Sequence, residues 1–193
     1  MQGYLTMFDE AFEQIGDLAP THVFIQCGVG SLAASLQAFL VERYGADRPL
    51  LICVEPTRAA CFYRSVAAGD GSAHVVTGRL DTIMAGLACG EPSSLAWNIL
   101  RDYGDLFVVC TDRVTVRGMR VLGNPLPGDR QIISGESGAV TLGLVYEAAA
   151  ETANRPLQEH LHLNRSSRIL LFSTEGDTDP QMYRSIVWGD WLP

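Results

Sequence analysis

Short runs of nearly uninterrupted apolar residues alternate along this chain with longer segments whose apolar residues recur every three or four positions. The short runs predict buried strands, and the longer segments predict amphipathic helices. Strands are expected at residues 21–27 (THVFIQC), 49–55 (PLLICVE), 106–111 (LFVVCT) and 168–173 (RILLFS). Helices are expected at residues 6–16, 31–44 and 59–68, from the end of the third strand to about residue 122, and at residues 137–152. Apolar strands separated by helices are typical of a mostly parallel sheet covered on both faces, so the expected fold class is α/β.

The 193 residues suffice for one domain with its own core, and no repeat or linker divides them. We therefore expect residues 1–193 to form a single α/β domain. In a sheet of this kind, ligands bind beyond the carboxyl ends of the strands. The segments at those ends are residues 27–32, 55–58, 111–113 and 173–179.

The segment Gln26-Cys27-Gly28-Val29-Gly30-Ser31-Leu32 joins the first strand to the following helix and is the first candidate binding site. Glycines let the backbone approach a ligand closely, and free N–H groups at a helix N-terminus favour an anion. Ser31 adds a hydroxyl and can cap the helix. A tight turn that binds nothing explains the same residues. A dinucleotide site also stays open, because Ala33 is small enough for the third position of that motif and Glu55 lies near the place of a ribose-binding acid.

Two further polar segments carry hydroxyl and carboxylate groups. Residues 134–139 (SGESGA) open the long helix, and capping serines alone would explain them. Residues 173–179 (STEGDTD) predict a polar turn in which Thr178 or Asp179 caps a short terminal helix, with Pro180 in its first turn. The three carboxylates of that turn lack the spacing of a calcium-binding loop, so no cation site is expected there.

All 14 basic residues are arginines, so the chain contains no lysine. A genome that prefers arginine explains this count. Its chemical consequence is that this chain alone has no side chain able to form a Schiff base, which excludes a self-sufficient enzyme of that kind. The 22 acidic residues bring the net charge to −8, which argues against a nucleic-acid partner.

The remaining composition points to a cytoplasmic protein without a metal. The five cysteines form no CxxC pair, and those that end apolar runs are expected to be reduced core thiols. They are Cys27, Cys53, Cys89 and Cys110. His160 and His162 are two residues apart, which places them on different faces of a helix and disfavours a metal site. The N-terminus lacks the basic region of a signal peptide, and no apolar stretch is long enough for a membrane span.

Five motifs, taken in order, resemble one known family: THVFIQCGVGSLA, TIMAGLACGEP, GMRVLGNP, ISGESGAV and STEGDTD. Together they are similar to the large domain of fold-type II pyridoxal-phosphate enzymes, the tryptophan synthase β-like family. The resemblance runs from Met1 to about Trp188. It implies a lyase that uses pyridoxal 5′-phosphate (PLP) for the β-elimination of a small amino acid, 2,3-diaminopropionate, to pyruvate and ammonia. It also implies a homodimer.

The resemblance assigns roles to individual residues. Ser173 matches the hydroxyl that faces the pyridine nitrogen of the cofactor, and Glu136 matches an acidic position near the ring. A neutral hydroxyl leaves that nitrogen largely unprotonated, which suits elimination over transamination. The implied phosphate cup consists of Gly28, Val29, Gly30, Ser31 and Leu32.

The resemblance also implies what these 193 residues lack. The family's Schiff-base lysine and its acid/base carboxylates precede the QGY segment, so no catalytic residue is expected here. The chain is therefore expected to be the carboxyl-terminal part of a larger enzyme, with an incomplete cofactor domain that is inactive alone. Two alternatives stay open: a non-catalytic phosphate-binding or interaction module completed by a partner chain, and a nucleotide-binding oxidoreductase domain that uses residues 28–33 and Glu55.

Overall fold

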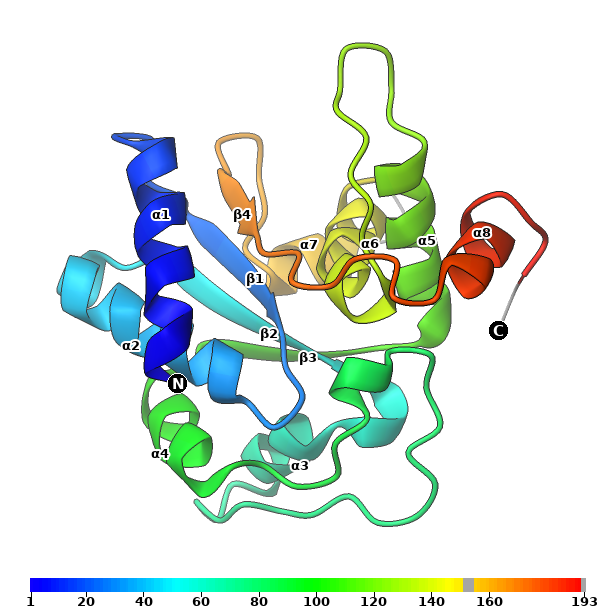
Figure 1. Cartoon of the computed structure of the whole chain (residues 1–193). Helices are drawn as coiled ribbons and strands as arrows, with labels where there is room; N and C mark the ends of the chain where they lie inside the picture. Colours follow the sequence, from blue (N-terminus) through cyan, green and yellow to red (C-terminus); the bar gives the residue numbers. More distant parts are fainter. Residues whose placement is uncertain (151–154, 192–193) are drawn as a thin grey trace.

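A computed structural model describes residues 1–150 and 155–191, and it contains one four-stranded parallel sheet in the order β3-β2-β1-β4 (Figure 1). The strands are β1 (His22–Gln26), β2 (Leu50–Pro56), β3 (Leu106–Cys110) and β4 (Ile169–Leu171). Their registers pair His22 with Leu50, Ile52 with Leu106, and His22 with Ile169. The α/β class and the parallel sheet predicted from the apolar runs are confirmed.

Eight α-helices lie within the described residues. They are α1 (Leu5–Ile15), α2 (Ser31–Tyr44), α3 (Cys61–Ala68), α4 (Ser94–Tyr103), α5 (Asp112–Gly123), α6 (Glu136–Ala150), α7 (Arg155–His160) and α8 (Pro180–Val187). The bounds of α2 match the expected helix, and α1, α5 and α6 begin within one residue of theirs. The expected helix at residues 137–152 ends with two residues that lie outside the described range. Among the described residues, no helix has the length and apolarity needed to cross a membrane.

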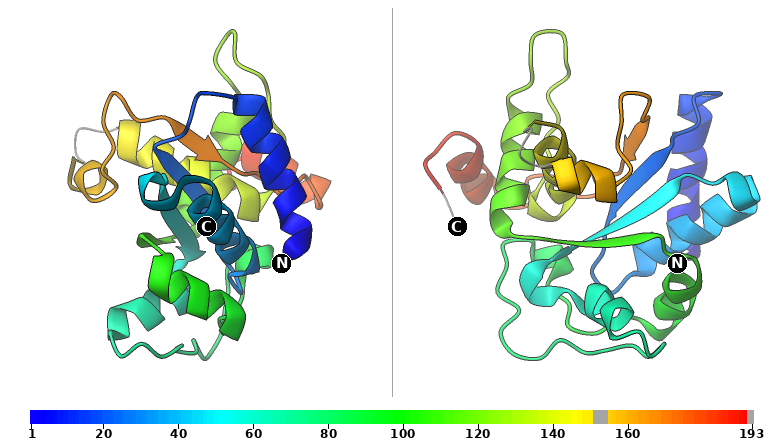
Figure 2. Two further views of the ribbon diagram at one scale, coloured as in Figure 1. Left: turned by 90° about the vertical axis from the view of Figure 1, so that its left-hand side faces the viewer. Right: turned by 180° about the vertical axis from the view of Figure 1, so that it is seen from behind.

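The two faces of the sheet carry different helices, as Figures 1 and 2 show. Side chains alternate along each strand. Val23 and Ile25 of β1 therefore pack into a core with α1, α2 and α4, whereas Phe24 packs on the opposite face with α6 and Leu157 of α7. A third cluster joins α5, α6 and α8 through side chains that include Met119 and Ile186. The amino ends of α2 and α6 are thus held on opposite sides of the sheet beside β1.

Two local predictions are corrected by the structure. The last strand was expected at residues 168–173, but its pairing with β1 ends at Leu171. Beyond it the chain turns, because Ser173 donates a hydrogen bond to Ser134 and Thr174 accepts one from Gln26. The helix α7 was not predicted, because its sequence RPLQEH carries too few apolar residues to show a period.

Candidate functional site

The turn after β1 is tightly packed at two glycines, and one of them, Gly30, requires glycine. Gly30 has φ +86°, and a Cβ there would lie 2.2 Å from Cζ of Phe62. A Cβ on Gly28 would lie 3.0 Å from the carbonyl oxygen of Gly86. A side chain is excluded at Gly30 and crowded at Gly28, so the backbone itself forms the surface of the turn at these glycines.

This turn forms one wall of a cavity of about 280 Å³ at the carboxyl end of β1. The lining residues come from five separate segments of the chain. They are Tyr4, Gln26, Gly28, Val29, Gly30, Ser31, Leu32, Gly86, Leu87, Cys89, Ser137, Thr174 and Glu175. The five residues proposed for the phosphate cup therefore lie together. Among the described residues, no cationic side chain lines the cavity, so its positive potential comes from backbone N–H groups.

The helix α2 begins at this cavity. Its N-cap residue is Gly30, and no side chain of the described residues caps its first turn. The suggestion that Ser31 caps this helix is therefore wrong, because Ser31 is its first helical residue. An uncapped N-terminus of a 14-residue helix presents N–H groups and the positive end of the helix dipole to an anion.

The opposite wall combines the start of α6 with the turn after β4. The Glu175 carboxylate accepts hydrogen bonds from the backbone N–H groups of Ser137 (2.5 Å) and Gly138 (3.3 Å). The Ser137 hydroxyl donates to the same carboxylate (3.3 Å) and accepts a bond from the N–H of Gly86 (3.2 Å). These contacts join three segments of the wall.

The turn after β4 also ends as predicted, since Asp179 caps α8 and Pro180 occupies its first turn.

Ser173 and Glu136 stand just beyond the lining of this cavity. The Ser173 hydroxyl donates to the Ser134 hydroxyl (2.8 Å), and its neighbour Thr174 lines the cavity. Glu136 opens α6 beside Ser137, and burial raises the pKa of its carboxyl, with Glu175 and Asp179 adding repulsion. Each of these two residues therefore lies next to the cavity, because the residue that follows it in the chain lines the cavity.

Gln26 is a further polar side chain in the lining. It is 4% exposed, and its amide nitrogen donates to the Thr174 hydroxyl (2.8 Å). Within the described residues its amide oxygen has no hydrogen-bond partner. Such an orphaned buried acceptor is uncommon in folded proteins.

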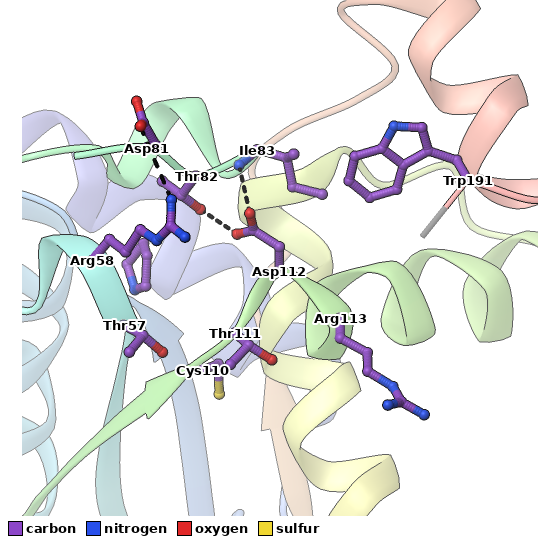
Figure 3. Close-up of a pocket in the computed structure, with 11 residues that line it drawn as sticks. Thr57, Arg58, Asp81, Thr82, Ile83, Cys110, Thr111, Asp112, Arg113 and Trp191 are labelled. Carbon is purple, nitrogen blue, oxygen red and sulfur yellow. Dashed lines mark hydrogen bonds and ion pairs between the residues drawn. The ribbon is translucent and has the colours of Figure 1, made fainter. Parts of the chain in front are cut away.

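A second cavity, of about 480 Å³, lies at the carboxyl ends of β2 and β3 (Figure 3). Its lining includes residues 56–58 of the predicted strand-end segment 55–58 and the whole of the segment 111–113. In Figure 3 the carboxylate of Asp112 points at Thr82 and Ile83 and accepts hydrogen bonds from the Thr82 hydroxyl (2.5 Å) and the Ile83 N–H (3.3 Å). Asp112 therefore fixes the segment that leads to Gly86, in the lining of the first cavity.

We expect Asp112→Ala to lower the free energy of unfolding by about 1–2 kcal/mol, because two hydrogen bonds to a charged acceptor and a first-turn carboxylate are lost. Urea denaturation measures the change. Asp129→Ala is the matched control, since Asp129 lies in an exposed loop, and it should change stability by less than about 0.5 kcal/mol. An Asp112 variant as stable as that control would contradict the role given to this carboxylate.

Glu55, the acid considered for a ribose, is 0% exposed and lies inside the protein. Its carboxylate accepts hydrogen bonds from the N–H groups of Phe62 (2.9 Å) and Tyr63 (2.7 Å) in the first turn of α3. Burial raises its pKa from an ordinary 4.5 to about 7. The carboxylate is thus engaged by its own chain, and the oxidoreductase alternative loses the acid on which it depends.

The prediction of reduced core thiols holds for three of the four cysteines that it named, Cys27, Cys53 and Cys110. All five thiols are free, and Cys27, Cys53, Cys61 and Cys110 are buried. Cys89, expected in the core, is only half-buried and lines the first cavity, because the 3-10 turn Ala85–Leu87 carries it out of the apolar interior. No cluster of potential metal ligands occurs among residues 1–150 and 155–191.

Comparison with known proteins identifies the family of this chain. A family model described as pyridoxal-phosphate-dependent enzyme matches residues 1–158, and the chain belongs to that family. It is similar to the diaminopropionate ammonia-lyase of Salmonella typhimurium, with 46% identity over 192 residues, and to that of Escherichia coli (strain K12), with 48% identity over 190 residues. These alignments cover 97% of this chain, which spans about half the length of these relatives (48% and 47%).

Solved structures agree with this assignment. The crystal structure of diaminopropionate ammonia lyase from Escherichia coli in complex with an aminoacrylate-PLP azomethine reaction intermediate has a TM-score of 0.88 and 47% identity. The matched region covers 97% of this chain and 47% of the chain in that crystal structure. A processed threonine deaminase isoform from Solanum lycopersicum shares the fold, with a TM-score of 0.74 at 19% identity. The family resemblance inferred from five motifs is confirmed.

Proposed function

We propose that this chain supplies the phosphate-binding part of a PLP-dependent site for the β-elimination of 2,3-diaminopropionate to pyruvate and ammonia. The observation that carries the proposal is the cavity at the carboxyl end of β1, where the glycine turn and the start of α2 offer backbone N–H groups suited to an anion. The similarity to diaminopropionate ammonia-lyases supports the substrate.

The residues present fit this cofactor. The cup consists of Gly28, Val29, Gly30, Ser31 and Leu32, whose backbone would hold the phosphate without a cationic side chain. The Ser173 hydroxyl, already engaged with Ser134, would face the pyridine nitrogen. When bound, PLP supplies the electron sink that such an elimination requires.

Two side chains of this chain, Ser173 and Glu136, would act beside the cofactor ring. A neutral hydroxyl at Ser173 would place no charge beside the ring nitrogen and would leave that nitrogen largely unprotonated, which would moderate the electron sink. Glu136 would stand beside the ring with a carboxyl whose pKa is raised by burial. Because the 14 basic residues are all arginines, no lysine of this chain can hold the cofactor covalently. Catalysis by this chain alone is therefore expected to be absent.

An activity measurement tests this proposal. The purified chain with PLP and 2,3-diaminopropionate should release no pyruvate above the rate of PLP alone. Adding the half of the Escherichia coli enzyme that this chain does not match should restore pyruvate release. Enzyme-like rates from the chain alone would refute the assigned division of roles. Restored assembly without activity would favour the non-catalytic phosphate-binding module.

A further inference from the structure

Two helix N-termini open on the same cavity. Gly30 and Ser31 at the start of α2 line one side, and Ser137 in the first turn of α6 lines the other. Both helices are long, with 14 and 15 residues, so each amino end carries N–H groups without a partner inside the helix and a positive dipole end. A phosphate compound entering this cavity therefore meets two possible anion sites.

The amino ends of α2 and α6 differ in one side chain, Glu175, which binds the N–H groups of α6 only. At α6 the Glu175 carboxylate already accepts the N–H groups of Ser137 and Gly138 and the Ser137 hydroxyl. At α2 no side chain caps the first turn. One N-terminus is thus neutralised by an internal anion, and the other remains open to an external anion.

We propose that Glu175 sets the orientation of the phosphate compound by filling the anion site of α6, so that the phosphate binds only at α2. This inference rests on the proposed function, because it concerns the same cavity. The cavity contains no cationic side chain that could select one end instead. With the phosphate directed to α2, the rest of the ligand extends toward the wall formed by Ser137 and Thr174, beside Ser173. Glu175 is therefore a positioning residue.

A carboxylate in the lining also has an electrostatic consequence. Its negative charge repels a phosphate bound at the opposite wall of the same small cavity. Glu175→Gln keeps an acceptor oxygen for the α6 N–H groups and removes the charge. We expect this variant to bind phosphate at residues 28–32 about threefold more tightly. Glu175→Ala removes the acceptor as well and should open a second anion site at α6.

Titration with inorganic phosphate, followed through the backbone amide signals in ¹H–¹⁵N spectra, tests this proposal. In the unmodified chain, phosphate should shift the amides of residues 28–32 and leave Ser137 and Gly138 unchanged. In Glu175→Ala, the Ser137 and Gly138 amides should also shift in a saturable manner. Asp177→Asn is the matched control, because Asp177 is an exposed carboxylate two residues away, and it should behave like the unmodified chain.

Two outcomes would overturn the proposal: phosphate shifting the Ser137 and Gly138 amides in the unmodified chain, or leaving them unchanged in Glu175→Ala. If the alanine variant does not fold, Glu175→Gln decides, and an unchanged affinity at residues 28–32 contradicts the role of Glu175. If no variant responds at residues 28–32, the proposed function fails. The Ser137 and Gly138 amides of Glu175→Ala then still report on Glu175.

Discussion

Replacing Gly30 by alanine is expected to lower the free energy of unfolding by at least about 2 kcal/mol and to remove phosphate binding at the start of α2. The added Cβ would lie 2.2 Å from Cζ of Phe62 and 3.0 Å from Cβ of Ala96, so the turn must move. The backbone at Gly30 also has φ +86°, which costs an alanine about 1 kcal/mol. Forcing an extra methyl into packed surroundings adds about 1–3 kcal/mol. Urea denaturation and a phosphate titration measure the two effects.

A double-mutant cycle separates the steric clash from the backbone strain. Phe62→Leu shortens the side chain that the new methyl would strike, so the two substitutions together should cost less than the sum of their separate costs. Gly3→Ala is the control, because a Cβ there meets nothing within 4 Å. Additive costs in the cycle would show that the contact with Phe62 does not shape the turn.

The second large effect is a pH dependence of stability that arises from Glu55. Burial raises the pKa of this carboxyl to about 7, from an ordinary value of 4.5 that applies in the unfolded chain. The folded protein therefore binds the proton more tightly. The resulting stabilisation is fully present below about pH 4.5 and is lost as the pH rises through about 7. Its full size is about 3 kcal/mol.

Chemical denaturation of the unmodified chain and of Glu55→Gln between pH 4.5 and pH 8 measures this effect. Glutamine resembles the protonated acid and does not titrate. The stability of the unmodified chain relative to Glu55→Gln should therefore fall by about 3 kcal/mol across this range. Subtracting the stability of Glu55→Gln from that of the unmodified chain at each pH cancels the contributions of other titrating groups, such as Glu136. A difference that stays constant with pH would mean that Glu55 titrates alike in the folded and unfolded chain.

The strands were predictable because each contains a short run of apolar residues, and a strand covered on both faces leaves that pattern in the sequence. In β1 the apolar run is Val23-Phe24-Ile25, and all five residues of this strand are buried. The short helix Arg155–His160 left no such pattern. The last strand was predicted too long, because the polar contacts that turn the chain away at Ser173 join it to residues distant in sequence.

The two walls of the candidate site were predictable to different degrees. Residues 28–32 form a continuous strand–turn–helix segment, so their glycines and the helix start are visible together in the sequence. The opposite wall is assembled from Gly86, Ser137 and Glu175, which lie far apart in the chain. Glu175 stood in a turn that the sequence marked as polar, but its partners Ser137 and Gly138 precede it by 38 and 37 residues. Only the fold brings a carboxylate to the start of α6.

The claim that the α2 turn binds the cofactor's phosphate is tested most directly by comparing pyridoxine 5′-phosphate with pyridoxine in equilibrium dialysis. Neither compound carries an aldehyde, so no imine to the terminal amine can contribute to binding. Charge-assisted hydrogen bonds to the phosphate should make pyridoxine 5′-phosphate bind at least about tenfold more tightly, and Gly30→Ala should abolish that preference. Equal affinities for the two compounds, or no saturable binding of the phosphorylated one, would contradict the account.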